Sequence, residues 1–91
     1  MCFEWDPRKA RLNLRTHGVS FEEASTVFDD PRGGLRFDLS HSDLEDRFLQ
    51  LGRSSQDRLL LVSHCYRNGK VRIISAPKVL PIEEIEYFRG D

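Results

Sequence analysis

The dipeptide Asn68-Gly69 constrains the fold more than any other feature of this sequence. It separates two stretches rich in branched and aromatic residues, 58–66 and 70–76. Asn-Gly favours the two-residue turn that joins antiparallel strands, because both residues tolerate a positive φ angle. The sequence therefore predicts a β-hairpin whose turn fixes the register. The expected facing pairs are Tyr66 with Val71, Cys65 with Arg72, and His64 with Ile73.

This register divides the hairpin into two faces. The more apolar face is expected to pack beneath helices and consists of Leu60, Val62, His64, Tyr66, Val71, Ile73 and Ser75. The other face consists of Leu59, Leu61, Ser63, Cys65, Arg72, Ile74, Ala76 and Lys78. A guanidinium among small side chains leaves room for a phosphate, which arginine can bind through two hydrogen bonds. The alternative is that Arg72 pairs with an acid, either Glu45, Asp46 or one near the C-terminus.

The rest of the chain supplies further strands and three helices. A short strand at 3–5 is followed by a helix from Asp6-Pro7 to Gly18, with Ala10, Leu14 and His17 on one side. Ser20 and Glu23 form a capping box for a second helix that ends before Pro31. Strands are expected at 35–39 and 47–52. A last helix opens at Pro81, with Ile82, Ile85 and Phe88 on its buried side.

These elements predict an α+β fold over one domain, 1–91. Its small antiparallel sheet has about four strands, with the two N-terminal helices packed on one face and the C-terminal helix closing the chain.

Charge is segregated along the chain although the formal net charge is only -1. Residues 18–46 contain eight acids and two bases, whereas residues 52–78 contain six bases and one acid. A polyanion such as RNA would be attracted to the second segment. Arg58, Arg67 and Lys70 are its candidate RNA-binding residues. The alternative is that these bases are solvated side chains that discourage edge-to-edge aggregation.

Several other classes of protein are not expected. The longest strongly apolar run, 59–62, is far too short to cross a bilayer, and residues 1–6 lack the pattern of a signal peptide. We therefore expect a cytoplasmic protein with no membrane partner. Cys2 and Cys65 lie far apart, and the three histidines are scattered. Neither a disulfide nor a metal site is expected from them.

Several motifs, taken in order, resemble the BrnT family of toxins. The N-terminal motifs are Phe3-Glu4-Trp5-Asp6-Pro7, Lys9-Ala10, Asn13-Leu14 and the run 17–24. The later motifs are the runs 27–31, 45–48, 51–52 and 72–76. Each motif is weak alone, but the ordered set covers nearly the whole chain.

The resemblance implies a RelE-like fold and a metal-independent endoribonuclease toxin of a type II toxin–antitoxin module, without a cofactor. It implies that the toxin inhibits translation by cutting RNA. The implied partner is a BrnA-type ribbon–helix–helix antitoxin, which silences the toxin and alone contacts DNA. The residues that match the family's functional positions are Glu45, Arg47, Arg72, Lys78 and Tyr87.

Cutting RNA without a metal needs a base, positive charge at the phosphate and an acid for the leaving oxygen. Arg47 and Arg72 are expected to hold the phosphate, with Lys78 assisting. Glu45 is the candidate base, although a plain ion pair with Arg47 is the alternative for it. Tyr87 or His64 is a candidate to orient the substrate or donate a proton.

Two departures from the family pattern leave a second function open. Pro77 stands where the family commonly has arginine, and the C-terminal helix is acidic instead of basic. The alternative is therefore a catalytically weakened or inactive binding module. Such a module would bind RNA or its antitoxin and contribute to promoter autoregulation.

Overall fold

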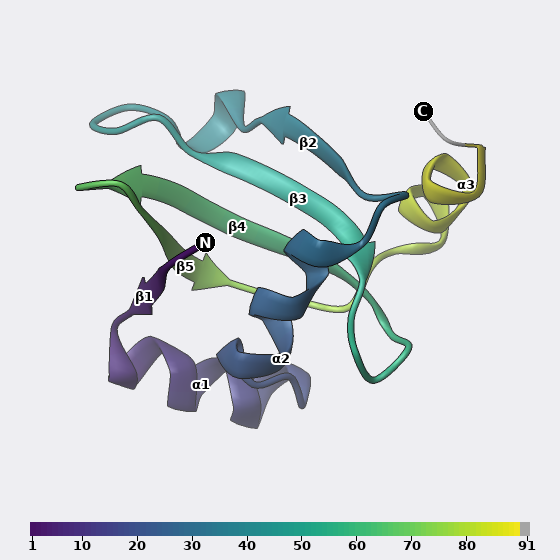
Figure 1. The fold of residues 1–91 in the computed structure, drawn as a ribbon, viewed down its shortest axis with the longest axis horizontal. Coiled ribbons are helices and arrows are strands. Elements are labelled where there is room, and N and C mark those ends of the chain that lie inside the picture. Colours follow the sequence, from purple (N-terminus) through teal and green to yellow (C-terminus); the bar gives the residue numbers. More distant parts are fainter. Residues whose placement is uncertain (90–91) are drawn as a thin grey trace.

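The structure, a computed structural model, describes residues 1–89, except for the side chains at positions 81, 83 and 86. In this part, five strands form one sheet in the order β1-β5-β4-β3-β2 (Figure 1). The strands are β1 (Phe3–Trp5), β2 (Gly34–Phe37), β3 (Phe48–Arg53), β4 (Leu59–Arg67) and β5 (Lys70–Ser75). The helices are α1 (Pro7–His17), α2 (Phe21–Ser25) and α3 (Pro81–Arg89), with 3-10 turns η1 (Thr26–Asp29) and η2 (Leu39–His41).

The α+β class is confirmed, but the expected sheet of about four antiparallel strands is wrong in two respects. There are five strands, and β1 runs parallel to β5, with Glu4 beside Arg72. A three-residue strand carries no pattern that identifies its partner. The tertiary structure supplies it: the backbone NH of Val71 donates to the Cys2 carbonyl at 2.9 Å.

The ends of α1 and the start of α2 follow the expected capping chemistry. The Asp6 carboxylate accepts a 2.8 Å hydrogen bond from the Arg8 NH, and Gly18 ends α1 with a φ of 69°. The Ser20 hydroxyl accepts a 3.0 Å bond from the Glu23 NH, which is one half of the expected capping box. The Glu23 carboxylate does not complete the box and instead accepts hydrogen bonds from Ser54 and Arg58. The capping contacts of Asp6 and Ser20 satisfy backbone groups that a helix end leaves unpaired.

The buried side of α1 differs from the expected one. Leu14 is 54% exposed, whereas Asn13 is buried. The Asn13 amide donates to the carbonyls of Val19 and Ala76, and its oxygen accepts from the Ala76 NH. Three side-chain hydrogen bonds, two of them to Ala76 in the sheet region, therefore decide which side of α1 faces the sheet, and helical periodicity alone cannot reveal them.

The predicted hairpin is confirmed. Asn68 and Gly69 have φ angles of 52° and 75°, and Cys65 faces Arg72 as expected. Beyond this point the register shifts: His64 faces Ile73 but Ser63 faces Ser75, so Ile74 is an extra residue. A bulge of one residue moves the following side chains to the other side of the sheet.

The bulge overturns the expected placement of three later residues. Ala76 lies in the core beneath the helices instead of on the Arg72 side. Lys78 forms an isolated bridge with Leu60, so both residues point to the same side of the sheet. Ser75 moves the other way and shares its side with Ser63.

We call the side of the sheet that α1 and α2 cover the helical face, and the other side the opposite face (Figure 1). The main core lies on the helical face. It contains Val19, Phe21, Ala24 and Val27 from the helical region and Leu60, Val62, Ile73 and Ala76 from the sheet region. Gly52 allows this packing, because an added Cβ would lie 2.8 Å from Val27 Cγ1.

Helix α3 packs on part of the opposite face. Tyr87 is 4% exposed and packs with Leu51 and Leu59. The expectation that Ile82, Ile85 and Phe88 form the buried side is wrong, since each is more than half exposed. None of the helices within residues 1–89 is long and apolar enough to cross a membrane.

Candidate functional site

Four basic residues share the uncovered part of the opposite face. Arg72 faces Cys65. Two residues closer to the turn, Arg67 faces Lys70, so both pairs lie on the same side of the sheet. Arg47 directly precedes Phe48, which faces His64 on the helical face. Because side chains alternate along a strand, Arg47 points to the opposite face. The four bases are Arg47, Arg67, Lys70 and Arg72, and we call them the basic patch.

Electrostatic effects confirm that members of the patch lie close together. Arg67 and Arg72 both favour the charged form of the Cys65 thiol, although burial raises the pKa of this thiol overall. Arg67, and to a smaller extent Arg47, lowers the pKa of Glu45. Cys65 is fully buried and so forms part of the floor between the arginines.

Two acids hold arginines of the basic patch. Glu45 accepts two 2.8 Å hydrogen bonds from Arg67, and Glu4 accepts one of 2.7 Å from Nη1 of Arg72. The hydrogen bonds from Arg67 lower the Glu45 pKa to about 2. Glu45 therefore pairs with Arg67 and not with Arg47. Within residues 1–89, the Arg47 guanidinium forms no hydrogen bond or ion pair.

The loop between β2 and β3 forms one wall of the site. The Asp38 NH donates to the Arg47 carbonyl at 2.8 Å. The Ser42 hydroxyl donates to the Asp38 carbonyl at 2.6 Å and accepts from the Arg47 NH at 3.0 Å. The loop lines one side of a pocket of about 360 Å³. The residues around this pocket are Ser40, His41, Asp43, Leu44, Glu45 and Arg47 and, from β4, Arg67.

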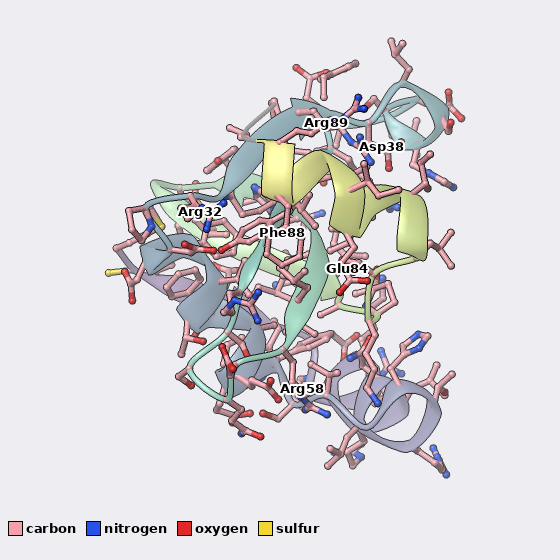
Figure 2. The ribbon with its side chains drawn as sticks, turned by 90° about the vertical axis from the view of Figure 1, so that its right-hand side faces the viewer. Arg32, Asp38, Arg58, Glu84, Phe88 and Arg89 are labelled. Atoms are coloured by element: carbon pink, nitrogen blue, oxygen red, sulfur yellow. The ribbon has the colours of Figure 1, made fainter. Side chains whose placement is uncertain are left out.

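Arg58 and Lys78 do not join the basic patch. Arg58 binds Glu23, whose side chain is 1% exposed, and also donates to the Gly18 carbonyl at 2.9 Å. This ion pair stabilises the contact between the β3–β4 loop and the helices. Lys78 is on the helical side and lowers the pKa of Glu23 in a minor way. Figure 2 shows Arg58 and Asp38 at opposite ends of the molecule.

Tyr87 also lies away from the basic patch. Its hydroxyl donates to Asp30 at 2.9 Å, and the guanidinium groups of Arg32 and Arg53 lie 5.2 and 5.6 Å from its ring centre. Arg53, beside Tyr87, is the last residue of β3, whereas Arg47 directly precedes this strand. The length of β3 therefore separates Arg53 from Arg47 by roughly 20 Å. Tyr87 therefore fixes α3 to the sheet, with Phe88 and Arg32 beside it.

His64 is fully buried on the helical face, as expected. One ring nitrogen lies 3.0 Å from the Val62 carbonyl, and burial lowers the pKa of the ring. It cannot reach a substrate on the opposite face.

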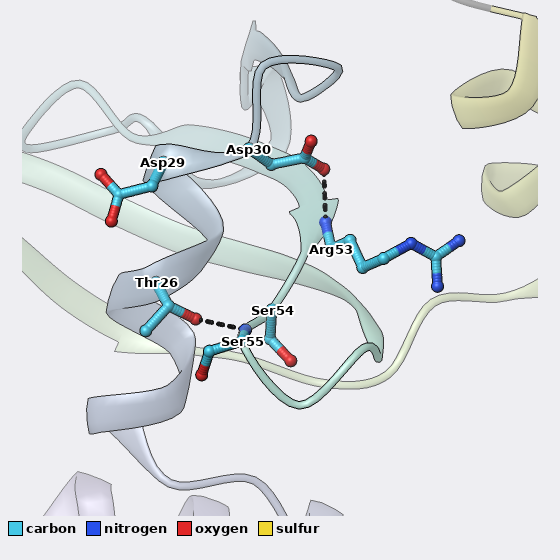
Figure 3. Close-up of a pocket in the computed structure, with 6 residues that line it drawn as sticks. All are labelled: Thr26, Asp29, Asp30, Arg53, Ser54 and Ser55. Atoms are coloured by element: carbon cyan, nitrogen blue, oxygen red, sulfur yellow. Dashed lines mark hydrogen bonds between the residues drawn. The ribbon is translucent and has the colours of Figure 1, made fainter.

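A second pocket lies between η1 and the β3–β4 loop (Figure 3). Its polar groups already bind one another: Asp30 accepts from the Arg53 NH at 2.7 Å, and Thr26 accepts from the Ser55 NH at 2.8 Å. The Arg53 side chain extends towards α3 (Figure 3). We assign this region a structural role.

Sequence reasoning missed two residues at the site, Glu4 and His41. Only the parallel pairing of β1 brings Glu4 to Arg72. His41 follows Asp38 by three residues in a polar loop, a spacing too common to identify a site. Among the side chains that the structure describes, no three from His, Cys, Asp or Glu gather in a group that could hold a metal ion.

Comparison with known proteins places this geometry in a family. The structure resembles the 1.1 Å crystal structure of the Brucella abortus ribonuclease toxin BrnT, with a TM-score of 0.65. The match covers 88% of this chain and 97% of that chain at 17% sequence identity, which shows a shared fold. No curated protein sequence matches the chain. The family model described as the ribonuclease toxin, BrnT, of type II toxin–antitoxin system matches residues 5–83. Because this match spans most of the sequence, the chain belongs to the BrnT family of type II ribonuclease toxins.

Proposed function

We propose that this protein is a metal-independent endoribonuclease that inhibits translation by cutting RNA on its opposite face. The observation that carries the proposal is the gathering of Arg47, Arg67 and Arg72 around Cys65 on a part of the sheet that α3 leaves open. A phosphodiester in cleavage gains negative charge, and fixed guanidinium groups stabilise that charge.

Arg47 and Arg72 are the proposed phosphate-binding residues. The Arg47 guanidinium has no hydrogen-bond or ion-pair partner in the described part of the chain. Arg72 donates to Glu4 through Nη1 alone, which leaves its other nitrogens available to a phosphate oxygen. Arg67 and Lys70, at the turn of the hairpin, extend the positive surface along which an RNA strand would lie.

The role of Glu45 follows from its ion pair. A carboxylate whose pKa is about 2 is a weak base and holds a proton poorly near neutral pH. We therefore propose that Glu45 orients Arg67 and does not take the proton of the attacking hydroxyl. Lys78 and Tyr87 have no part in this scheme because of where they lie.

The proposed partner is a BrnA-type ribbon–helix–helix antitoxin that alone contacts DNA. Membership of a type II toxin family implies an antitoxin. The basic patch already binds two carboxylates of its own chain, Glu4 and Glu45. An acidic antitoxin segment could bind the same arginines and so exclude RNA.

A second candidate is a binding module that holds RNA or antitoxin without cutting. Pro77 favours this candidate, because the residue that follows Ala76 carries no charge. The Pro77 carbonyl accepts a 3.1 Å hydrogen bond from the Leu61 NH. The proline is therefore part of the sheet edge and not part of the basic patch.

Incubation of the purified protein with a synthetic RNA, with and without EDTA, separates these functions. We expect cleavage that resists EDTA and falls by about a hundredfold or more in Arg72→Ala and Arg47→Ala, as when a donor to a developing oxyanion is lost. Lys78→Ala is the matched control and should cleave normally. Full activity in both arginine variants contradicts the assignment, and RNA binding without cleavage supports the binding module.

A further inference from the structure

A histidine–aspartate pair lies in the pocket beside the basic patch. His41 Nδ1 is 3.0 Å from Asp38 Oδ2. The Asp38 side chain is 11% exposed, whereas that of His41 is 65% exposed. The carboxylate therefore fixes an imidazole that solvent can reach. Among the described residues, Nε2 of His41 has no hydrogen-bond partner.

The same hydrogen bonds that close the loop connect this pair to Arg47. Asp38 also accepts from the Ser40 NH at 3.2 Å, while its own NH binds the Arg47 carbonyl. Ser42 bridges Asp38 and Arg47 from the other side. His41 is thus held in a small hydrogen-bonded unit that also holds a phosphate-binding candidate.

Among the described residues that line the pocket, His41 is the one that carries an imidazole. The pocket contains His41 together with Asp43, Glu45, Arg47 and Arg67. The guanidinium groups remain charged, and Arg67 makes the Glu45 carboxylate a weak base. Imidazole is the side chain that exchanges a proton near neutral pH, and an aspartate on one ring nitrogen stabilises its charged form.

We propose that His41 is the general base of RNA cleavage and that Asp38 is its positioning residue; this inference rests on the proposed ribonuclease function. His41 Nε2 takes the proton of the 2′-hydroxyl. The 2′-oxygen forms a bond to phosphorus while the bond from phosphorus to the 5′-oxygen breaks.

The leaving 5′-oxygen takes a proton from water, and the resulting hydroxide recovers the proton from the imidazolium. The products are a 2′,3′-cyclic phosphate and a 5′-hydroxyl, and no further reactant is consumed. Arg47 and Arg72, the proposed phosphate-binding residues, offset the charge that develops on the phosphate oxygens.

The direct test is cleavage of a synthetic RNA by His41→Ala, with imidazole added to the solution. We expect a loss of about a hundredfold or more in kcat, the usual effect of removing a general base. Added imidazole should restore part of the rate, because the exposed site leaves room for it. His17→Ala on α1 is the matched control and should retain normal cleavage, and imidazole should not restore Arg47→Ala.

The pH profile gives an independent readout. The rising limb of kcat against pH in the parent protein should disappear in His41→Ala and return, with the pKa of imidazole, in the rescued reaction. Asp38→Asn keeps the side-chain length but removes the charge that faces Nδ1 of His41. We expect a lower kcat with KM little changed.

The outcomes separate this inference from the function on which it rests. Normal cleavage by His41→Ala, with Arg47→Ala inactive, overturns the inference and leaves the proposed function intact. Loss of both folding and cleavage in His41→Ala, without rescue by imidazole and with an unchanged kcat in Asp38→Asn, also overturns it. A parent protein that does not cleave RNA overturns both.

Discussion

The Arg67 guanidinium binds the Glu45 carboxylate through two hydrogen bonds, each 2.8 Å long. The two residues come from different parts of the site: Arg67 ends β4, and Glu45 belongs to the loop before β3. Their contact joins the hairpin to the loop that carries Arg47. It therefore controls both the shape of the pocket and the chemistry of its carboxylate.

The first prediction concerns the titration of Glu45. Its pKa is lowered to about 2 in the folded protein by Arg67, from an ordinary 4.5. The ion pair therefore stabilises the fold fully above about pH 4.5, and this contribution is lost as the pH falls towards 2. In Arg67→Gln, NMR titration should show a higher Glu45 pKa. Urea unfolding should show a smaller loss of stability across this window. An unchanged Glu45 titration in Arg67→Gln would contradict the assigned cause. Glu22→Gln on α2, which leaves the pair of Arg67 and Glu45 intact, is the control.

The second prediction concerns the buried carboxylate of Glu23. Arg58→Ala would leave it without its charged partner, and we expect a loss of about 3 kcal/mol in the free energy of unfolding. Arg8→Ala removes an arginine that is 83% exposed and pairs only with Asp6, so the loss should be under about 1 kcal/mol. Equal effects in urea unfolding would show that the Glu23 pair is not a structural element.

The third prediction separates structure from catalysis at Tyr87. Tyr87→Phe removes the hydrogen bond to Asp30 and should cost about 1 kcal/mol of stability with normal RNA cleavage. Tyr87→Ala empties the cluster around Leu51 and Leu59 and should cost about 3–5 kcal/mol. Thermal unfolding and a cleavage assay measure both effects. A large loss of kcat in a stably folded Tyr87→Phe would place the hydroxyl in the reaction.

The fourth prediction concerns the salt dependence of RNA binding. Each phosphate contact by a base releases counterions, with a contribution of roughly 0.7 to the slope of log K against log salt for single strands. Lys70→Ala should reduce the slope by about this amount because Lys70 belongs to the basic patch. Lys9→Ala on α1 removes the same charge outside the patch and should leave the slope unchanged. Equal slopes for the parent protein, Lys70→Ala and Lys9→Ala would show that Lys70 does not contact the RNA.

Local chemistry predicted the elements of this fold better than their partners. The Asn68-Gly69 turn and the Asp6 and Ser20 caps act within a few residues, and all three appear as expected. The partner of β1 and the burial of Asn13 depend on contacts more than sixty residues apart. No periodicity within a short window contains that information.

The same limit explains how much of the site was predicted. Arg47 and Arg72 share a face, as expected, because strand alternation and one turn decide their positions. Lys78 was misplaced because the extra residue at Ile74 reverses the sides beyond it. Arg58 was assigned to RNA because a basic residue in a basic segment does not reveal a buried acid such as Glu23.

The hydrogen bond between Asp38 and Arg47 brings the two ends of the loop together where β2 and β3 part. A segment that leaves and rejoins a sheet at adjacent points can change in length or composition without disturbing the strands. Exchange of residues 39–46 between homologous toxins should therefore leave the strands, and the arginines on them, in place.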